Sequence, residues 1–452
     1  PVFHKISLLL NILNWTYRYY KYKFNTVKRV IFLTVLLIGT YVLEFLLLNP
    51  GNVADEIHYY KEPSKISVTN PTIYKEDLKH YYETLKTLDQ TDFENIDESI
   101  SSNTDSFVQN FNSSINEVVD EINLNLLFYN FNKFRDSNNG IKGIYVNGYH
   151  MNNEEKVTEV KEILKNTNVN TLVIDAKTDN GHIMFKSNVP EVGVLNNERI
   201  KYDATSLNIL REVKEIYLIA RIVVFQDPIF AKKFNEEAVY DSKSNNIYSQ
   251  DGQYFLDPSS ELVREYITGL SIEACRLGFN EIQFDYIRYP DSNYQFMVFE
   301  EESNYENRVN NINTFLREAK EALHKEGCLV SADIFGYVLT NKSDGGIGQN
   351  LETIVENVDF ISPMVYPSHY SNGSFGYTNP NNHPYSVVTN ALEDGLKRGV
   401  SEEQLRPYLQ GFWHTVQDVR ENIKAAEDKQ LDWLIWNNLT RYELDYFTKL
   451  ES

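Results

Sequence analysis

Three aspartates stand where short β-branched segments end, and their placement suggests acid–base chemistry. Asp175 ends V-I-D in L-V-I-D-A-K-T-D-N-G, Asp285 ends E-I-Q-F-D, and Asp333 lies in V-S-A-D-I-F-G. If these segments are parallel strands of a barrel, their ends meet at one rim, where such barrels build their active sites. Glycoside hydrolysis uses two carboxyls that flank the bond to be broken. The pattern therefore favours Asp285 and Asp333 as a catalytic pair.

Further polar and aromatic residues follow the other expected strand ends, where they could hold a sugar. Aromatic faces pack on sugar rings, while charged and amide groups bond hydroxyls. We expect Arg288 also to stabilise the negative charge of Asp285, because a nearby cation favours a carboxylate. The expected substrate-binding residues are Asp175, Lys177, Arg288, Tyr366, His369, Gln410, Trp413 and Trp436.

Each of these residues also has a structural interpretation. A strand-end aspartate can simply cap a helix or anchor a loop, and Trp413 and Trp436 could belong to the core. Arg221 and Glu281 lie midway along neighbouring expected strands, so we expect them to form a buried ion pair in the barrel floor rather than to act on substrate. Gln283 could join that pair.

The elements that would position these residues alternate regularly from Gly140 onward. Eight strands, each followed by a helix, are the pattern of a (β/α)8 TIM barrel. A doubly wound open sheet is the rival, but its Gly-rich phosphate turn is absent after the first strand, which continues V-N-G-Y-H. The expected strands are 143–147, 171–175, 216–224, 281–286, 329–334, 360–365, 406–412 and 433–436. The expected helices are 154–166, 205–215, 261–277, 305–326, 351–357, 385–398, 416–429 and 441–450.

The N-terminal part predicts a membrane anchor. Residues 30–48 are apolar with one charge, Glu44, and are long enough to span a bilayer. Residues 1–29 carry Lys and Arg but no Asp or Glu, which predicts a cytoplasmic N-terminus and an extracytoplasmic remainder at the cell membrane. A cleaved signal peptide is the alternative. The predicted organisation is a cytoplasmic basic segment (1–29), a transmembrane anchor (30–48), an acidic linker or stalk (49–139) and the barrel (140–452).

Composition narrows the function classes. The chain has 452 residues and a net charge of -21, and no basic patch indicates nucleic acid as a partner. We find no cofactor motif and no metal-binding spacing, so we expect neither a cofactor nor a metal. Cys275 and Cys328 form no C-x-x-C, and we expect two buried thiols, with a disulfide as the alternative in an extracytoplasmic domain.

Long ordered motifs across about 142–442 resemble a known family. They are K-G-I-Y-V-N-G-Y, L-V-I-D-A-K-T-D-N-G, I-A-R-I-V-V-F-Q-D-P, G-F-N-E-I-Q-F-D-Y-I-R-Y-P, S-A-D-I-F-G, G-I-G-Q, I-S-P-M-V-Y-P-S-H-Y, R-P-Y-L-Q-G-F and L-I-W-N. The chain resembles a glycoside hydrolase family of bacterial extracytoplasmic TIM barrels, distantly similar to the α-amylase and α-galactosidase groups. The resemblance implies that Asp285, at the fourth strand, is the nucleophile. Amylases take their acid from the fifth strand, where this chain has Asp333 instead of Glu.

These observations lead to one expectation and two rivals. The expected function is a membrane-anchored retaining glycoside hydrolase that acts on a cell-envelope glycan or exopolysaccharide, with Asp285 as nucleophile and Asp333 as acid and base. The first rival is a non-catalytic glycan-binding or scaffold protein built on the same barrel. The second is a metal-assisted hydrolase that uses the aspartates and His369.

Overall fold

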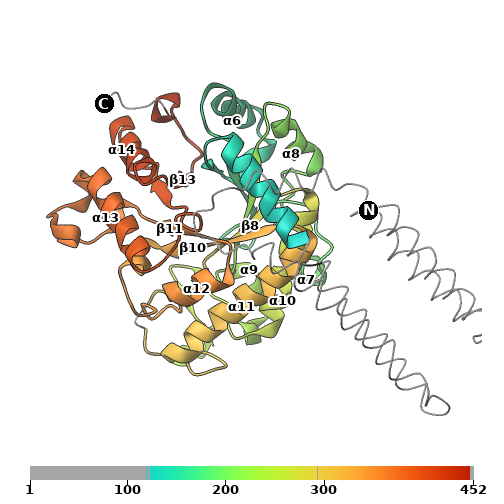
Figure 1. Cartoon of the computed structure of the whole chain (residues 1–452). Coiled ribbons are helices and arrows are strands. Elements are labelled where there is room, and N and C mark those ends of the chain that lie inside the picture. The colour runs from blue at the N-terminus through green and yellow to red at the C-terminus, as the bar shows by residue number, and fades with distance from the viewer. Residues whose placement is uncertain (1–119, 121–122, 293, 448–452) are drawn as a thin grey trace, which may run out of the picture. The chain divides into compact units, whose positions relative to one another are not determined.

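We analysed a computed structural model, which describes residues 120, 123–292 and 294–447 (Figure 1). The predicted cytoplasmic segment and anchor (1–48) and most of the predicted linker lie outside the described residues. Within the described ranges, no helix combines the length and apolarity that crossing a membrane requires.

Eight parallel strands form a closed barrel, and this confirms the predicted (β/α)8 architecture. Hydrogen bonding links the strands in the order β1, β13, β12, β11, β10, β8, β3 and β2, so the first and last strands pair and close the ring. The predicted strands agree to within one or two residues except the seventh, which is shorter. The barrel strands are β1 (Lys142–Val146), β2 (Thr171–Lys177), β3 (Tyr217–Val223), β8 (Glu281–Asp285), β10 (Leu329–Phe335), β11 (Phe360–Met364), β12 (Tyr408–Gln410) and β13 (Trp433–Trp436).

Helices surround the barrel, and local sequence sets their ends. The helix α10 starts after Ser260, whose hydroxyl accepts the N–H of Val263, and it stops at Gly278, whose φ of 115° ends the helix. The predicted last helix, 441–450, is instead a 3-10 turn at Leu444–Phe447 within the described residues. The helices are α6 (Glu154–Asn166), α7 (Pro190–Leu195), α8 (Ala204–Arg211), α9 (Pro228–Lys233), α10 (Glu261–Leu277), α11 (Tyr305–Glu326), α12 (Leu351–Asn357), α13 (Pro384–Lys397) and α14 (Val416–Glu427).

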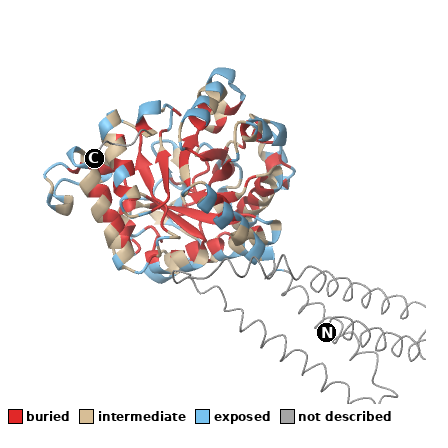
Figure 2. Cartoon of the chain, turned by 45° about the horizontal axis from the view of Figure 1, so that its top comes forward, coloured by how far each residue is buried: buried red, intermediate tan, exposed pale blue. Residues whose placement is uncertain are grey.

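Alternation along the strands divides the apolar shell from the barrel interior. On β8, Ile282 and Phe284 belong to the apolar core between strands and helices. Glu281, Gln283 and Asp285 alternate with them and are equally buried, so their side chains point into the barrel. Figure 2 shows the strands buried throughout and the exposed residues gathered on the outer helices and loops. The interior of this barrel is therefore unusually polar.

A helix at residues 123–137 covers the end of the barrel where the strands begin. Phe131 packs against Tyr217 and Phe360, the first residues of β3 and β11, with ring centroids 5.4 and 4.7 Å apart. Arg135 forms an ion pair of 2.8 Å with Asp432, just before β13. Part of the segment predicted as linker (49–139) is thus a component of the packed domain.

Two connections at the opposite end of the barrel join into a small sheet. The strands β4 (Tyr240–Asp241) and β5 (Asn246–Ile247) follow β3, and β4 also pairs with β9 (Met297–Val298), which follows β8. This pairing ties the loop of the third barrel strand to the loop of the fourth. A second short hairpin, β6 (Ser249–Gln250) and β7 (Gln253–Tyr254), follows β5 in the same connection.

The two cysteines form a disulfide, so the expectation of two free thiols is wrong. Cys275 near the end of α10 and Cys328 immediately before β10 are joined, and they lie 53 residues apart in the chain. Sequence spacing alone could not show this pairing, because it depends on α10 and β10 meeting in space.

Replacing both cysteines with Ser is expected to lower the free energy of unfolding by about 2–4 kcal/mol. The crosslink closes a long loop, and removing it restores conformational entropy to the unfolded chain. Urea unfolding of the double variant and the oxidised wild type would measure the difference. Wild type unfolded with reductant is the control, and equal stability of all three samples would contradict the prediction.

Candidate active site

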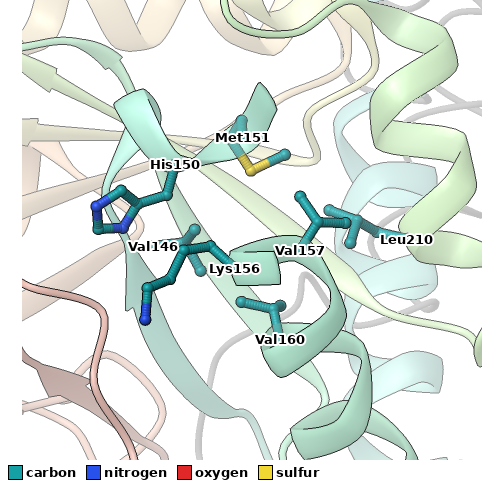
Figure 3. Close-up of a pocket in the computed structure, with 7 residues that line it drawn as sticks. All are labelled: Val146, His150, Met151, Lys156, Val157, Val160 and Leu210. Atoms are coloured by element: carbon teal, nitrogen blue, oxygen red, sulfur yellow. The ribbon is translucent and has the colours of Figure 1, made fainter. Parts of the chain in front are cut away.

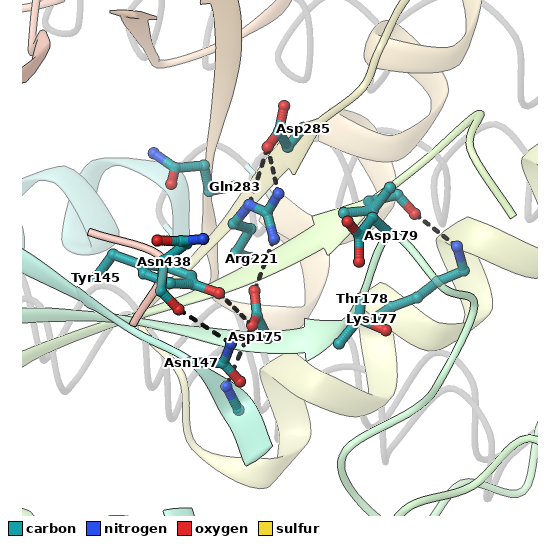
Figure 4. A network of polar contacts seen from close by, with 12 residues as sticks. Tyr145, Asn147, Asp175, Lys177, Thr178, Asp179, Arg221, Gln283, Asp285 and Asn438 are labelled. Atoms are coloured by element: carbon teal, nitrogen blue, oxygen red, sulfur yellow. Dashed lines mark hydrogen bonds and ion pairs between the residues drawn. The ribbon is translucent and has the colours of Figure 1, made fainter. Parts of the chain in front are cut away.

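A buried guanidinium organises the mouth of the barrel (Figure 4). Arg221 on β3 donates from Nε and Nη2 to Oδ2 of Asp285, at 2.9 and 2.5 Å, and from Nη1 to Oδ1 of Asp175 at 2.7 Å. Its Cζ atom also lies 4.8 Å from the ring centre of Trp436. Arg221 therefore fixes two of the three predicted carboxylates in place and balances their charge.

The predicted Arg221–Glu281 ion pair is wrong, because each residue has a different partner. Glu281 lies deeper in the barrel and pairs with Arg406, which enters from the start of β12, and it also accepts from Ser331. Arg406 was missed in the sequence, although it alternates with Tyr408 and Gln410 in R-P-Y-L-Q and so shares their inward face.

Asp175 is used inside the protein rather than presented to a ligand. Its Oδ2 accepts the hydroxyl of Tyr145 at 2.6 Å and the N–H of Gly148 at 3.1 Å, while Oδ1 accepts Arg221. Burial raises the pKa of Asp175, and the charge of Arg221 opposes that shift. Asp175 thus holds Arg221 in this structure, and its predicted contact with sugar hydroxyls stays a prediction.

Asp285 ends β8 at the barrel mouth, as predicted. One oxygen, Oδ2, accepts both bonds from Arg221, and Oδ1 accepts the backbone N–H of Tyr286 at 2.7 Å. Tyr286 has a φ of 53°, in the left-handed region that a bulky residue rarely adopts. The chain therefore turns sharply after the strand, and three donors stabilise the negative charge of the carboxylate.

Asp333 on β10 has the opposite surroundings. It is 2 % exposed, and Oδ1 is buried without a hydrogen-bond partner among the described residues. Burial raises the pKa of Asp333 well above its usual value, and the nearby negative charge of Asp285 raises it further, against the pull of Arg221. The barrel mouth thus contains Asp333, whose carboxyl favours the protonated form, and Asp285, whose carboxylate accepts hydrogen bonds.

Lys177 is the last residue of β2, and its ammonium group is paired within the protein rather than exposed to a ligand. It is fully buried and donates to the carbonyl of Val223 at 2.7 Å and to Asp227 at 3.0 Å. The pairing between β2 and β3 shifts register between Asp175 and Lys177, so the two residues do not share a face as simple alternation would suggest.

Two further predicted residues organise the barrel mouth. Trp436 is half-buried and stacks on Tyr145 at 3.9 Å between ring centres as well as on Arg221. Gln410 is buried and bridges two loops, accepting the N–H of Ser368 and donating to the carbonyl of Phe412. Gln410 thus has both ends of its amide bonded within the protein, and the predicted contact of Trp436 with sugar stays a prediction.

An aromatic series leads from the carboxyls to the rim. Tyr366 is buried, and burial followed by the charge of Asp333 raises its pKa well above the usual value. Its ring contacts both His369 and Phe412, and Phe412 contacts Trp413 at 5.1 Å between centres. Trp413 is 83 % exposed and has a φ of 54°. Tyr366, His369 and Trp413 are thus placed together, as predicted.

Arg288 does not bond Asp285, so its predicted role in stabilising that charge is wrong. Arg221 performs it instead. The guanidinium of Arg288 lies 4.9 Å from the ring centres of both Tyr286 and Phe335, and one nitrogen donates to the carbonyl of Tyr289 at 3.3 Å. It is half-buried beside the ends of β8 and β10.

A hollow on the outside of the barrel contains none of the three carboxylates (Figure 3). The space inside it, open solvent included, is about 200 Å³, and it lies between β1, α6 and α8. In the described part of the chain, no group of three His, Cys, Asp or Glu side chains is arranged to hold a metal ion. The hollow is lined by Val146, His150, Met151, Lys156, Val157, Val160 and Leu210.

Among the solved structures to which the chain is similar, one shares its overall fold at a TM-score above 0.5. A glycoside hydrolase domain of PgaB (BpsB) from Bordetella bronchiseptica has a TM-score of 0.52 and 10% identity, over 69% of this chain and 99% of that one. A hypothetical protein from Ruminiclostridium thermocellum ATCC 27405 is 30% identical over 42% of this chain and 96% of that one, with a TM-score of 0.38. The glycoside hydrolase domain of PelA from Pseudomonas aeruginosa is 9% identical over 67% and 96%, with a TM-score of 0.41. A search of curated proteins finds no match.

The family comparison covers nearly the whole barrel. A family model described as "Putative glycosyl hydrolase domain" matches residues 143–442, from the first strand to beyond the last. This range contains all three carboxyls, Arg221 and the aromatic series. The chain therefore belongs to this family of glycosyl hydrolase domains.

Proposed function

We propose that the barrel hydrolyses O-glycosyl bonds in a polysaccharide, with Asp333 as general acid and Asp285 as nucleophile. The observation that carries this proposal is the contrast between the two carboxyls. Burial and the charge of Asp285 raise the pKa of Asp333, whereas Arg221 and the N–H of Tyr286 bind Asp285. Opposed environments of two neighbouring carboxyls are how glycosidases assign the acid and the base.

A retaining reaction would proceed in two steps at these residues. In the first, Asp333 gives its proton to the glycosidic oxygen, while an oxygen of Asp285 attacks the anomeric carbon and the leaving sugar departs. In the second, Asp333 takes a proton from water, whose oxygen replaces Asp285 on the anomeric carbon. Among the described residues, Oδ1 of Asp285 accepts a single hydrogen bond, so it is the oxygen with the more available lone pair.

The test is the stereochemistry of the first product. Wild-type protein would be incubated with cell-envelope glycans and exopolysaccharides, and proton NMR would follow the anomeric signal before mutarotation. Retention is expected. Inversion would remove Asp285 as nucleophile and make it the base that activates water. Failure to hydrolyse any polymer of the panel would contradict the proposed activity.

A non-catalytic glycan-binding protein is the second candidate, favoured by one contact. Arg221 donates two charged hydrogen bonds to the same oxygen of Asp285, and such bonds make a carboxylate a weaker nucleophile. Glycan binding that survives in an Asp285→Asn, Asp333→Asn double variant, together with no hydrolysis by wild type, would favour this candidate.

Replacing Trp413 with Ala is expected to raise KM for long glycans about 3- to 10-fold and to leave kcat unchanged. A ring that is 83 % exposed buries little in the protein but offers a face on which sugar can pack. Initial rates on long and short oligosaccharides would measure the effect. Leu439→Ala, another exposed apolar position, is the control. An equal KM in wild type and variant would contradict the prediction.

We further propose that the domain works outside the cytoplasm, held by an anchor at residues 30–48. The charge distribution of residues 1–29 supports this orientation. The Cys275–Cys328 disulfide also supports it, because disulfides persist mainly in oxidising compartments. Protease treatment of intact spheroplasts should digest the barrel, and protection of the barrel would contradict the proposal.

A further inference from the structure

The guanidinium of Arg288 lacks an anionic partner at the barrel mouth. Among the described residues it takes part in no ion pair, and its one hydrogen bond is the 3.3 Å contact with the carbonyl of Tyr289. Other cations of the barrel are neutralised: Arg221 bonds two aspartates, and Lys177 bonds Asp227. Since a guanidinium carries five N–H donors, most of those of Arg288 remain available.

The surroundings of Arg288 restrict how it can turn. Its guanidinium lies 4.9 Å from the centres of the Tyr286 and Phe335 rings and 6.0 Å from that of Phe255. The Phe335 and Phe255 rings offer no hydrogen-bond acceptor, and among the described residues the only acceptor that Arg288 uses is the carbonyl of Tyr289. A guanidinium oriented in this way presents a planar fork, which matches the two oxygens of a carboxylate.

Arg288 also stands beside the reacting groups. Tyr286 directly follows Asp285, and Phe335 ends the strand that carries Asp333 two residues earlier. Strands β8 and β10 are neighbours in the barrel, with Phe284 paired to Ala332. A ligand group bound by Arg288 would therefore belong to a sugar next to the bond that is cleaved.

We propose that Arg288 is a specificity-determining residue that binds an oxyanion on the glycan, so that the substrate is an acidic polysaccharide. A carboxylate of a uronic acid fits the planar fork directly, and a phosphate or sulfate ester shares the same chemistry. Placing a neutral sugar there would leave the cation without a counter-charge, whereas an acidic sugar supplies one in a partly desolvated site. The inference rests on the proposed function for its reaction but not for its binding.

The test compares one polymer before and after its charge is removed. Uronic acid oligosaccharides and their carboxyl-reduced forms, in which CH2OH replaces the carboxylate, would be titrated into full-length Asp333→Asn protein by calorimetry. We expect the acidic form to bind at least about tenfold more tightly, as one charge-assisted fork provides. Phosphorylated and sulfated oligosaccharides form the second arm and distinguish the sources of the oxyanion.

Variants assign the preference to Arg288. Arg288→Gln is expected to remove the preference because it weakens the binding of the acidic ligand alone. Arg288→Lys, which keeps the charge but not the planar fork, should retain part of the preference. Arg264→Gln, which removes a half-buried arginine on α10 paired with the exposed Glu318, is the control and should leave the preference unchanged. If Arg288→Gln does not fold, as judged by circular dichroism, the Lys variant carries the test.

The outcomes separate this inference from the proposed activity. Equal binding of acidic and reduced forms, or no binding of any acidic oligosaccharide, would overturn the role of Arg288. If Arg288→Gln weakens the binding of the acidic and the reduced forms equally, Arg288 only packs the loops. That result would also overturn its proposed role. If wild type binds the acidic forms selectively but does not hydrolyse them, the role of Arg288 is supported and the proposed hydrolysis is contradicted.

Discussion

Asp333→Asn protein is expected to lose hydrolysis while remaining folded. Asn keeps the shape of the side chain but cannot give a proton to the glycosidic oxygen, so kcat should fall about 10²–10⁴-fold. Rates with a glycan that wild type cleaves would measure the loss.

Asp285→Asn should lose activity as well, but it also deprives the buried Arg221 of a charged partner and should lower the free energy of unfolding. Full activity in either variant would contradict the assignment.

The Asp333→Asn substitution is expected to stabilise the folded protein, although it abolishes hydrolysis. Burial and then the charge of Asp285 raise the pKa of Asp333 in the folded protein. Between the ordinary carboxyl pKa and that raised value, the folded state binds more protons than the unfolded state, so stability falls as pH rises through the folded pKa. Asp333→Asn removes this loss and should gain stability relative to wild type towards neutral pH.

Urea unfolding between pH 5 and 8 would measure this difference, with Asp359→Asn as the matched control. Asp359 is also buried, which opposes its charge, but the hydrogen bond from His324 and the charge of Lys320 lower its pKa. The stabilisation that ionised Asp359 gives the folded state is present above the ordinary carboxyl pKa and is lost as pH falls. Asp359→Asn should therefore be destabilised at neutral pH. Parallel behaviour of the two variants would show that Asp333 is not held protonated.

The second large effect concerns the floor of the barrel. Arg406→Met is expected to lower the free energy of unfolding by about 3–5 kcal/mol, because it leaves the fully buried Glu281 without its cation. Thermal and urea unfolding would measure the loss. Arg264→Met, which breaks the exposed pair with Glu318, is the control and should change stability by less than about 1 kcal/mol.

Replacing both partners should reverse most of the damage. The Glu281→Leu, Arg406→Met protein has no buried charge at these two positions, and it also loses Oε2 of Glu281 and Nε of Arg406, which lack hydrogen-bond partners among the described residues. Such replacements are often neutral or stabilising. A double variant that is less stable than Arg406→Met alone would show that the pair has a positive net contribution.

The sequence predicted the barrel because its signals are local. Capped helices such as Glu261–Leu277 and Tyr305–Glu326 have the predicted bounds, since apolar periodicity and a terminal glycine define each of them. The strand-end positions of Asp285 and Asp333 were predicted for the same reason. Alternation within one strand also placed Glu281 and Gln283 on the interior face.

The partners of these residues were not predictable, because they depend on how neighbouring strands are staggered. Arg221 is level with Gln283, and its long side chain reaches up to Asp285 rather than down to Glu281. A register shift after Asp175 likewise turned Lys177 to Asp227. Single-strand periodicity contains no information on stagger between strands, so it assigned Arg221 the wrong carboxylate and Lys177 the wrong side of the sheet.

The helix at residues 123–137 fixes the end of the barrel at which the chain enters the domain. Phe131 and Arg135 attach it to the closed end of the barrel, where the strands begin, whereas Asp285 and Asp333 lie at the other end. If the preceding chain were attached to a support, the attachment would therefore act at the end of the barrel opposite to Asp285 and Asp333. A long polymer lying across the end that carries these carboxyls would then not have to pass the point of attachment.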